Sequence, residues 1–354
     1  MFRLIIKKLA YGILVLAGVV VIVFFIFQGF ADPSRLIVGQ TGDKKTMENI
    51  RKELYLDQPK WKQFLLYLND VSPICVHSKE EIADKDLRGI FIGGGKKPDS
   101  YRVGIKFPYL RRSYQTKKKV SDVLLEALPG TIMLAFAAMI FATIIGILLG
   151  VLAAVKQNTW MDTTSVFTSV IGISAPSFFM AIVIAYLFGV VLHSYTGLNL
   201  TGSWFDIDET TGHRYLTLQN LILPAITLGI RPLAIITQLT RSSMLDVLNQ
   251  DYIRTAYAKG LSKRTVVFKH ALRNALNPVI TAITGWFAEL LAGAFFVEYI
   301  FGWKGIGKVT VDALDKLDYP VVMGSVLFSA TIFVVINILA DILYGVVDPR
   351  VRVQ

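Results

Sequence analysis

The chain has 354 residues, of which 53% are hydrophobic and only 18% are charged. This composition is too apolar for an ordinary soluble domain and indicates a membrane protein. The formal net charge of +11 could indicate a nucleic-acid partner, but basic residues beside apolar runs are more simply explained as signals that orient membrane helices. No nucleic acid is therefore expected as a partner.

Six apolar runs are candidates for membrane helices, since a helix needs about 20 mostly apolar residues to cross a bilayer core. They are expected at residues 9–30, 130–155, 165–192, 219–239, 279–300 and 321–346. Basic residues precede the first run, and no small-residue cleavage site follows it, which predicts a retained anchor. The sequence thus predicts an all-α membrane protein with six transmembrane helices.

The orientation of these helices follows from the basic residues in short segments. Lysine and arginine in short loops resist translocation, and they occur at the N-terminus, between the fourth and fifth runs and at the C-terminus. An even number of spans places these segments on one side, so we predict that both termini are cytoplasmic. Residues 31–129 are then external, because a loop longer than about 60 residues crosses largely regardless of its charge.

The chain is accordingly divided into three parts. Residues 1–30 hold the N-terminal segment and first span, residues 31–129 form the external loop region, and residues 130–354 form a core with five spans. In the external region, apolar residues at helical spacing predict two short amphipathic helices separated at Asp57 and Pro59. Residues 71–103 are polar and contain a glycine triplet.

The stretch DYIRTAYAKGLSKRTVVFKHALRNALNP, residues 251–278, collects basic residues between two apolar runs. We predict that Asp251 caps a short helix that ends at Ala258, with Gly260 as the left-handed residue after it. Ser262 is expected to cap a second helix that continues into the fifth span. The side chains of Thr255, Ala256 and Ala258 are small and allow another protein to approach the helix backbone, while Arg254 and Lys259 offer charged contacts. These features predict a docking element within the loop 240–275. From composition alone an alternative stays open, in which the basic residues only hold the topology and contact anionic lipid headgroups.

The same stretch resembles the cytoplasmic signature of permease subunits of ATP-binding-cassette importers, in the dipeptide and oligopeptide branch. The general importer pattern is Glu-Ala-Ala, three residues and Gly. Here Arg254-Thr255-Ala256 and Gly260 occupy those places, a departure that is usual in the peptide branch. Other similar segments, in chain order along nearly the whole chain, are ELYLDQPKWKQFLLYL, SAPSFF, ILPAITLG, TRSSMLDVL, GAFFVEYIFGWKGIG, DYPVVMG and DPR.

The resemblance implies the type I fold of importer permeases, with a large external loop between the first two helices, in the bacterial cytoplasmic (inner) membrane. It implies four kinds of partner: a second homologous permease, two ATP-binding-cassette ATPase subunits, an external solute-binding protein and a peptide substrate. It also implies that this chain is a transport subunit without a cofactor, and that ATP and Mg²⁺ bind to the ATPases. The residues expected to couple to an ATPase are Arg254, Thr255, Ala256, Ala258, Lys259, Gly260 and Leu261.

Two other kinds of site are not expected in this chain. An ATPase needs the phosphate-binding loop G-x-x-x-x-G-K-[ST], but in the nearest string, IFIGGGKK, Ile90 replaces the first glycine and Lys97 replaces serine or threonine. The single cysteine, Cys75, excludes a cysteine-rich metal site, and no histidine has a partner at metal-ligand spacing. No metal site is predicted.

Charged residues inside the predicted spans need compensation. Arg231 and Glu289 lie near the middle of the fourth and fifth runs, where an arginine costs roughly 2.5 to 3.5 kcal/mol to insert. We expect them either to pair or to line a wet pathway, where they would suit the ammonium and carboxylate of a peptide; a purely structural ion pair is the alternative. Asn337 and Asp341, four residues apart on the sixth run, are expected to join helices.

Some alternatives stay open. Residues 71–103 are inserted where the peptide branch has a short connection, and we expect them to adjust docking of the binding protein or to be a passive excursion. The same machine could import nickel or another metal chelate, glutathione or another small solute. A secondary transporter coupled to protons through Glu289 is less favoured, because it leaves the docking loop unexplained.

Overall fold

The computed structural model describes residues 2–29, 48, 51, 55–95, 97, 100–207, 213–292 and 294–347. The chain divides into two compact units. The core unit comprises Met1–Lys8, Ala127–Lys308 and Ile332–Gln354, and the N-terminal unit comprises Leu9–Glu126 and Val309–Thr331. Helices that contribute residues to both are α1 (Phe2–Gly29), α6 (Val120–Val155), α15 (Ile306–Asp315) and α16 (Tyr319–Val347).

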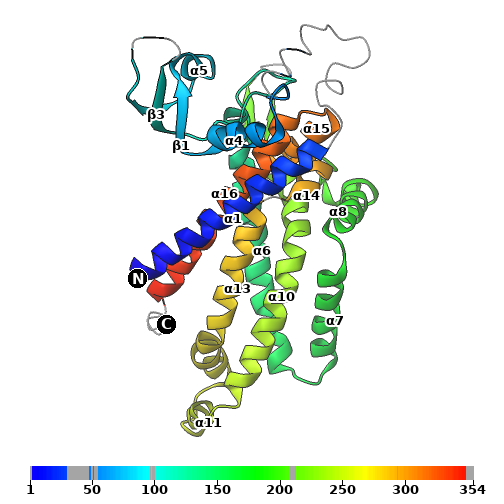
Figure 1. Ribbon diagram of the computed structural model, residues 1–354. Coiled ribbons are helices and arrows are strands. Elements are labelled where there is room, and N and C mark those ends of the chain that lie inside the picture. The colour runs from blue at the N-terminus through cyan, green and yellow to red at the C-terminus, as the bar shows by residue number, and fades with distance from the viewer. Residues whose placement is uncertain are drawn as a thin grey trace. The chain divides into compact units, whose positions relative to one another are not determined.

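The core unit is built around α10 (Ile222–Leu248), which runs beside α6 and α13 in Figure 1 and also contacts α7, α8 and α14. The other helices of this unit are α7 (Trp160–Ser174), α8 (Ser177–Tyr186), α9 (His193–Thr196), α11 (Asp251–Ala258), α12 (Lys263–Thr265), α13 (Leu272–Ala292) and α14 (Phe295–Ile300). Helical turns of other types lie at Leu187–Val191, Leu218–Leu221 and Val266–Ala271. Strands β4 (Phe205–Ile207) and β5 (Arg214–Leu216) pair antiparallel.

Two glycines let α6 approach α10 closely. A Cβ atom added to Gly150 would lie 2.5 Å from the Cβ of Thr240, and one added to Gly146 would lie 3.0 Å from the carbonyl oxygen of Leu233. Because the two glycines are four residues apart, they share one face of α6. Small residues at this spacing permit close helix packing in a membrane.

Among the described residues, five helical segments are long and apolar enough to span a membrane: Ile6–Phe27, Val120–Val155, Leu218–Leu248, Lys263–Ala292 and Tyr319–Ile342. A sixth candidate is the pair of α7 and α8, which is bent by 109°. The predicted third span, 165–192, is therefore not one continuous helix. The break falls at Ala175 and Pro176, because proline lacks an N–H group and forces the preceding residue into extended backbone, here with ψ of 130° at Ala175.

The ends of three predicted spans also differ from the structure. The fourth was expected to end at residue 239, but its helix continues to Leu248. The helix of the second span begins at Val120, ten residues before the predicted start at residue 130. The fifth was expected to end at residue 300, but α13 ends at Ala292 and α14 is a separate helix that begins at Phe295. Apolar residues continue through this break, so hydropathy alone could not locate it.

The N-terminal unit contains a small antiparallel sheet in the strand order β1-β3-β2. Its elements are α4 (Lys60–Val71), β1 (Ile74–Ser78), α5 (Lys79–Asp84), β2 (Gly89–Ile92) and β3 (Tyr101–Lys106). The inserted stretch 71–103 thus holds ordered strands and a helix. Of the two predicted amphipathic helices, α4 is the second; the first falls largely outside the described residues.

The sheet has one apolar face that no other described part of its own unit covers. The register pairs Ile74 with Ile105 and Val76 with Val103, and on the other side of β3 it pairs Ile90 with Ile105 and Ile92 with Val103. Residues opposite one another project to the same face of a sheet. All of these side chains are exposed.

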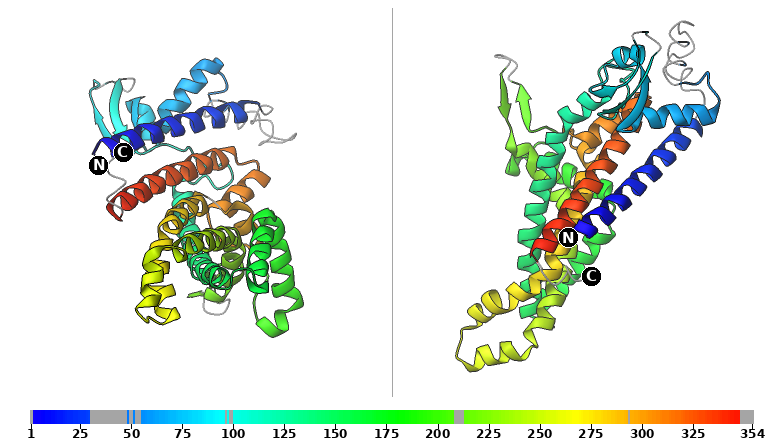
Figure 2. Two further views of the ribbon diagram at one scale, coloured as in Figure 1. Left: turned by 90° about the horizontal axis from the view of Figure 1, so that it is seen from below. Right: turned by 60° about the vertical axis from the view of Figure 1, so that its left-hand side comes forward.

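Helix α4 packs across the C-terminal end of α1 within the N-terminal unit, as the right-hand view of Figure 2 shows. The ring of Phe24 lies 5.1 Å from the ring of Phe64 and 5.8 Å from that of Tyr67. Met323 and Leu327 of α16 complete the same hydrophobic cluster. Burial of these aromatic rings fixes α4 on α1.

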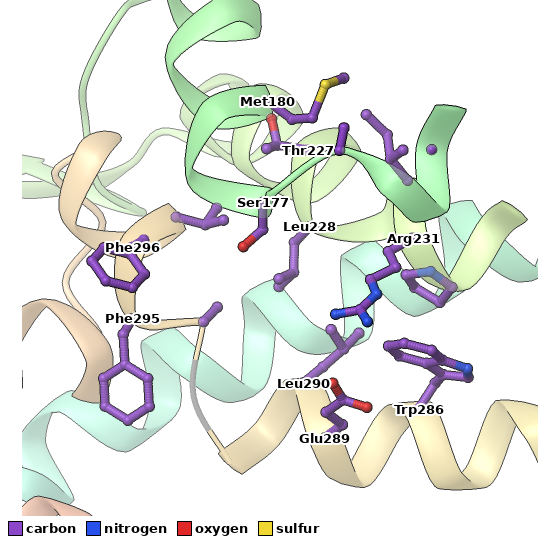
Figure 3. A pocket seen from close by; sticks show the side chains of 16 residues that line it. Ser177, Met180, Thr227, Leu228, Arg231, Trp286, Glu289, Leu290, Phe295 and Phe296 are labelled. Atoms are coloured by element: carbon purple, nitrogen blue, oxygen red, sulfur yellow. The ribbon is translucent and has the colours of Figure 1, made fainter. Parts of the chain in front are cut away.

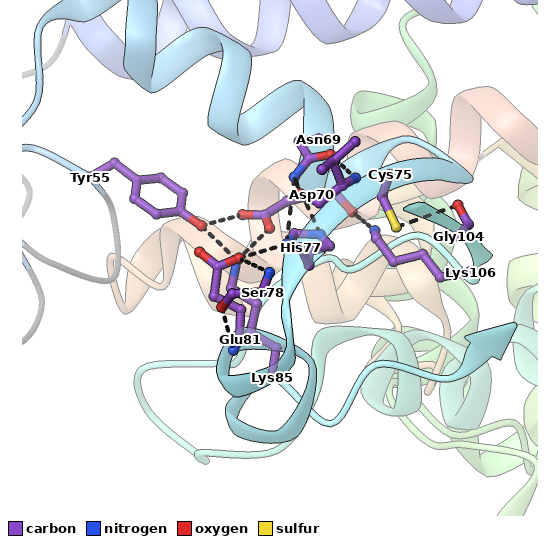
Figure 4. A network of polar contacts seen from close by, with 11 residues as sticks. Tyr55, Asn69, Asp70, Cys75, His77, Ser78, Glu81, Lys85, Gly104 and Lys106 are labelled. Atoms are coloured by element: carbon purple, nitrogen blue, oxygen red, sulfur yellow. Dashed lines mark hydrogen bonds and ion pairs between the residues drawn. The ribbon is translucent and has the colours of Figure 1, made fainter. Parts of the chain in front are cut away.

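A polar network fixes the other side of α4 (Figure 4). The Lys85 ammonium donates to Asp70 (2.7 Å) and to the Tyr55 hydroxyl (2.6 Å), and Tyr55 donates to Asp70 (3.1 Å). Burial, together with the charge of Asp70, raises the pKa of Tyr55 to about 12. Because Asp70 is buried and fully partnered, α4 is tied firmly to the segment that follows α5.

Candidate functional site

The first helix of the basic loop is α11, and its start differs from the prediction. Its cap residue is Gln250, in extended conformation and without a side-chain hydrogen bond to the first turn of the helix, so the prediction that Asp251 is the cap is wrong. Asp251 already has helical backbone, and its carboxylate lies in the first turn, where it favours the helix dipole and approaches Arg254 (Oδ1 to Nη1, 3.5 Å). Gly260 has φ of +77°, which confirms the predicted left-handed residue.

The second helix of the loop begins at Ser262, whose hydroxyl accepts the N–H of Thr265 (3.4 Å). The predicted cap is therefore confirmed. The helix continues from α12 through the turn Val266–Ala271 into α13, so one helical segment extends over Lys263–Ala292 and is long and apolar enough to span a membrane. The loop is thus connected without a break to the membrane helix that follows it.

Helix α11 has one buried face and one exposed face. Ile253 is 1% exposed and Ala256 is 7% exposed, and both pack in a hydrophobic cluster with Val151 of α6, Met244 of α10 and Val266. Such burial anchors the helix to the ends of the surrounding helices. The exposed face and the turn after it present Asp251, Tyr252, Arg254, Thr255, Tyr257, Ala258, Lys259, Gly260 and Leu261.

The residues predicted to couple to an ATPase therefore lie at the surface, with one exception. Ala256 faces the chain's own hydrophobic cluster, because it is three residues from Ile253 and shares its helix face. Its small side chain thus serves close packing of α11 on its own chain rather than an exposed contact. A hydrogen bond from Asn274 to the Tyr252 hydroxyl (2.8 Å) further ties α11 to α13.

A two-point ion pair joins α7 to α10 near this loop, and sequence reasoning missed it. Arg241 donates from Nε to Oδ1 of Asp162 (2.5 Å) and from Nη2 to Oδ2 (2.8 Å). Asp162 is buried, and it also accepts the backbone N–H of Asn158 (3.0 Å). Planar guanidinium and carboxylate groups in this arrangement give a strong, directional contact. The predicted fourth run ended at residue 239, so Arg241 was assigned to the basic loop, and nothing in the sequence pointed to Asp162.

A cavity of about 160 Å³ lies within the core unit, between α7, α8, α10, α13 and α14. Its lining is partly apolar and partly polar, and Figure 3 shows the side chains that converge on it. The polar and aromatic members are Ser177, Thr227, Arg231, Trp286, Glu289, Phe295 and Phe296.

The two predicted intramembrane charges both line this cavity. In Figure 3, the Arg231 guanidinium and the Glu289 carboxylate point toward the same space, and both side chains are exposed. The structure gives no ion pair between these two described residues. Instead, the guanidinium carbon of Arg231 lies 5.4 Å from the centre of the Trp286 ring, in a cation–π contact. Both charged groups are thus available to a ligand.

A fully buried glutamate, Glu298 of α14, organises the segment between α14 and α15. Its carboxylate accepts hydrogen bonds from the hydroxyl of Thr131 on α6 (2.8 Å) and from the backbone N–H groups of Gly307 (2.7 Å) and Lys308 (3.2 Å). A Cβ atom added to Gly305 would lie 2.3 Å from this carboxylate. The glycine is therefore required by the close approach of the glutamate. Glu298 lies within the segment GAFFVEYIFGWKGIG, and the sequence alone did not predict its role.

The two polar residues predicted to join helices behave differently. Asp341 forms an ion pair with Lys8 of α1 (2.7 Å), and both side chains are partly exposed. The amide of Asn337 donates to the carbonyl oxygen of Phe333, one turn earlier in its own helix (2.9 Å). Asp341 therefore connects α16 to another helix, whereas Asn337 bonds within α16.

Across the part of the chain that the structure describes, no group of three His, Cys, Asp or Glu side chains could hold a metal ion.

Comparison with known proteins gives matches along the chain. The family described as "Binding-protein-dependent transport system inner membrane component" matches residues 146–353, and the family described as "Binding-prot-dependent transport system membrane comp, N-term" matches residues 1–81. The dipeptide transport system permease protein DppB of Alkalihalophilus pseudofirmus is 34% identical over 360 residues, covering 98% of this chain and 98% of that protein. The glutathione transport system permease protein GsiC of Escherichia coli is 34% identical over 353 residues, covering 99% of each. A chain of an inward-facing MetNI methionine ABC transporter structure is 15% identical, with a TM-score of 0.47, and the alignment covers 64% of this chain and 96% of that one.

Proposed function

Because the chain belongs to the family of binding-protein-dependent transport system inner membrane components, we propose that it is the permease subunit of an ATP-driven importer of dipeptides or oligopeptides. As a member of this family it is a multi-pass membrane transport subunit and not an enzyme, and ATP hydrolysis lies with partner ATPases. ATP and Mg²⁺ bind to those partners, and this chain carries no cofactor of its own.

The observation that carries the proposal is the exposed face of α11. Its buried face is held by Ile253 and Ala256 against α6 and α10, so a force on the exposed face reaches the membrane helices rather than bending a loose loop. An ATPase that docks on Arg254, Thr255, Ala258, Lys259, Gly260 and Leu261 therefore moves α10 and α13 when it closes on ATP. The topology that suits this coupling has both termini and the α11 loop in the cytoplasm of a bacterial cell.

The complete importer contains, besides this chain, a second homologous permease, two ATP-binding-cassette ATPases and an external solute-binding protein. The cavity beside α10 then forms part of the solute pathway. Arg231 attracts the carboxylate of a peptide, and Glu289 attracts its ammonium group. Supporting this use, both side chains face the cavity of the core unit and neither is engaged in an ion pair with the other.

The N-terminal unit supplies the surface for the solute-binding protein. Residues 71–103 build a sheet whose exposed face carries Ile74, Val76, Ile90, Ile92, Val103 and Ile105. An apolar patch of this kind is unusual on a surface that stays in water. We assign it to the external partner, which makes the insertion part of the docking surface rather than a passive excursion.

Glutathione is a second candidate solute, because a glutathione permease is 34% identical to this chain, although a dipeptide permease of Haemophilus influenzae reaches 44% over 253 residues. The test is ATP-dependent uptake into proteoliposomes that contain both permeases and both ATPases, with the solute-binding protein added outside. Uptake of a labelled dipeptide that excess glutathione does not inhibit supports the peptide assignment. Uptake of glutathione but not of the dipeptide would replace the peptide assignment with a glutathione assignment. Uptake driven by a proton gradient without ATP would contradict the proposal that the protein belongs to an ATP-driven importer.

A further inference from the structure

Helix α4 of the N-terminal unit has two apolar faces, and only one of them packs against other described parts of this unit. Phe64 and Tyr67 pack on Phe24 of α1, as described above. The second face consists of Trp61, Leu65 and Leu68, which are 66%, 52% and 38% exposed. Their spacing of four and three residues places them in one stripe along the helix.

The depth of α4 relative to a bilayer is fixed by its partner helix. Phe24 lies in the last turn of the apolar segment Ile6–Phe27, which is long enough to span a membrane. Because Phe24 stacks directly against α4, this helix lies at the membrane boundary at the C-terminal end of α1. Next to Phe24, α1 exposes the apolar side chains of Ile22, Phe25 and Ile26, so a lipid-facing surface already exists at this level.

The chemistry of the stripe and its flanks fits that boundary. With about 100° between successive helical residues, Lys60 and Lys62 fall on opposite sides of the stripe, each about 100° from its centre. Both lysines are exposed. Lysines placed in this way can keep their stems along the acyl chains and their ammonium groups at the phosphates, and tryptophan prefers the same zone.

We propose that α4 lies in the membrane interface, with Trp61, Leu65 and Leu68 in the upper acyl chains and Lys60 and Lys62 at the headgroups. The occupant of the exposed stripe is the phospholipid bilayer, as a continuation of the lipid-facing surface of α1. The helix thereby holds the start of the sheet-bearing segment at a fixed level against the membrane, since Asp70 at its other end is tied to Lys85. This role is independent of which solute the importer carries.

The proposal is tested with an environment-sensitive fluorophore attached to a cysteine at position 65, in the assembled complex in proteoliposomes. The only native cysteine, Cys75, is buried and bonds to the Gly104 carbonyl oxygen, so labelling with a thiol reagent is directed to the new site. Leu65→Cys is compared with Lys62→Cys, which carries the probe on the polar flank of the same helix. Leu68→Cys serves as a second site on the stripe in case Leu65→Cys does not assemble.

The expected result is a blue-shifted emission at position 65, with loss of intensity when the vesicles contain phosphatidylcholine brominated in the upper acyl chain. At position 62 the emission wavelength of the fluorophore is closer to its value in water, and the quenching by brominated lipid is weaker. Water-like, unquenched emission at both stripe positions overturns the proposal. Emission that turns blue only after the solute-binding protein is added also overturns it, because the stripe would then be a protein-docking surface.

Discussion

Asp162 and Arg241 form a two-point ion pair that holds the first turn of α7 against α10, seven residues before α10 ends at Leu248. The next helix is α11, so the bent pair of α7 and α8 is fastened to the element that leads into the exposed loop. If an ATPase docked on α11 displaces α10, as proposed above, the displacement acts on α7 as well. Through this ion pair, a displacement of the α11 loop can be transmitted to the cavity, because both α7 and α10 line it.

Breaking this ion pair destabilises the protein. We expect Asp162→Asn to lower the free energy of unfolding by about 2 kcal/mol, since a hydrogen bond to a charged group contributes roughly 1.5 to 3 kcal/mol and Arg241 is partly exposed. Thermal unfolding in detergent measures the loss. Asp246→Asn is the matched control, because Asp246 is an exposed carboxylate on α10, the helix that carries Arg241. Equal melting temperatures for the two variants would show that the pair contributes nothing.

The glycine beside Glu298 cannot carry a side chain. Gly305→Ala would bring a Cβ atom within 2.3 Å of the Glu298 carboxylate and 2.6 Å of the Thr131 hydroxyl, and these groups are buried and mutually bonded. We expect this substitution to lower the free energy of unfolding by roughly 1 to 3 kcal/mol, as overpacking does at other buried sites. The loss would be observed as a lower melting temperature. Gly285→Ala is the control: its Cβ would meet nothing within 4 Å, and alanine favours a helix over glycine. A tolerated Gly305→Ala would mean that Glu298 can leave its place.

The two faces of α11 separate stability from coupling. Ile253→Ala leaves a cavity in the buried cluster and should lower the free energy of unfolding by about 2 to 5 kcal/mol. The isolated chain should therefore have a lower melting temperature. Tyr257→Ala, on the exposed face, should leave that temperature unchanged and weaken association with the ATPases, measured by co-purification. If Tyr257→Ala has no effect on association and uptake, the exposed face is not the docking surface.

The charged groups of the cavity should affect solute affinity. We expect Arg231→Gln and Glu289→Gln to raise the KM for dipeptide uptake while the complex still assembles, because each variant keeps a polar side chain and loses its charge. Thr227→Ser is the matched control, since it keeps the hydroxyl that bonds to the Leu223 carbonyl oxygen in the same cavity. Normal uptake kinetics combined with poorer assembly would show that the two charges are structural.

The exposed face of the three-stranded sheet should carry part of the binding-protein affinity. Val103→Glu places a charge at the centre of this face, where the side chain is exposed and no buried contact is lost. The melting temperature should therefore stay constant, while the affinity of the complex for the solute-binding protein falls. Lys79→Gln on α5 provides a control outside the apolar face with the same change of one negative unit in net charge. Unchanged affinity for Val103→Glu would leave the insertion without a docking role.

Local chemistry explains what the sequence could predict. Gly260 and Ser262 were predicted correctly because a left-handed turn and a helix cap depend on single residue types at fixed places. The strands of the insertion left a signal that went unused, the period-two alternation in pairs such as Ile74 and Val76. The polar composition around that signal led to the expectation of a loop.

Long-range contacts could not be predicted in the same way. The partners Asp162 and Arg241 lie 79 residues apart, and Thr131 and Glu298 lie 167 residues apart, so no periodicity connects them. The bend of 109° between α7 and α8 was also missed, because a hydropathy average does not register the direction of the chain. Pro176 marked the place of the break, but a proline can equally kink a continuous span.

The central claim is that the α11 loop couples this chain to an ATPase, and Gly260→Asp tests it most directly. Gly260 is exposed, and a Cβ atom there meets nothing within 4 Å, so the substitution acts on the left-handed turn and on the docking surface rather than on packing. Gly260→Asn is the matched control, because asparagine tolerates this backbone conformation and adds no charge. We predict that Gly260→Asp abolishes ATP-dependent dipeptide uptake in proteoliposomes, either in an assembled complex or together with loss of ATPase association, while Gly260→Asn retains much of it. Unchanged uptake with Gly260→Asp would show that the basic stretch is a topology signal and that the coupling contact lies elsewhere.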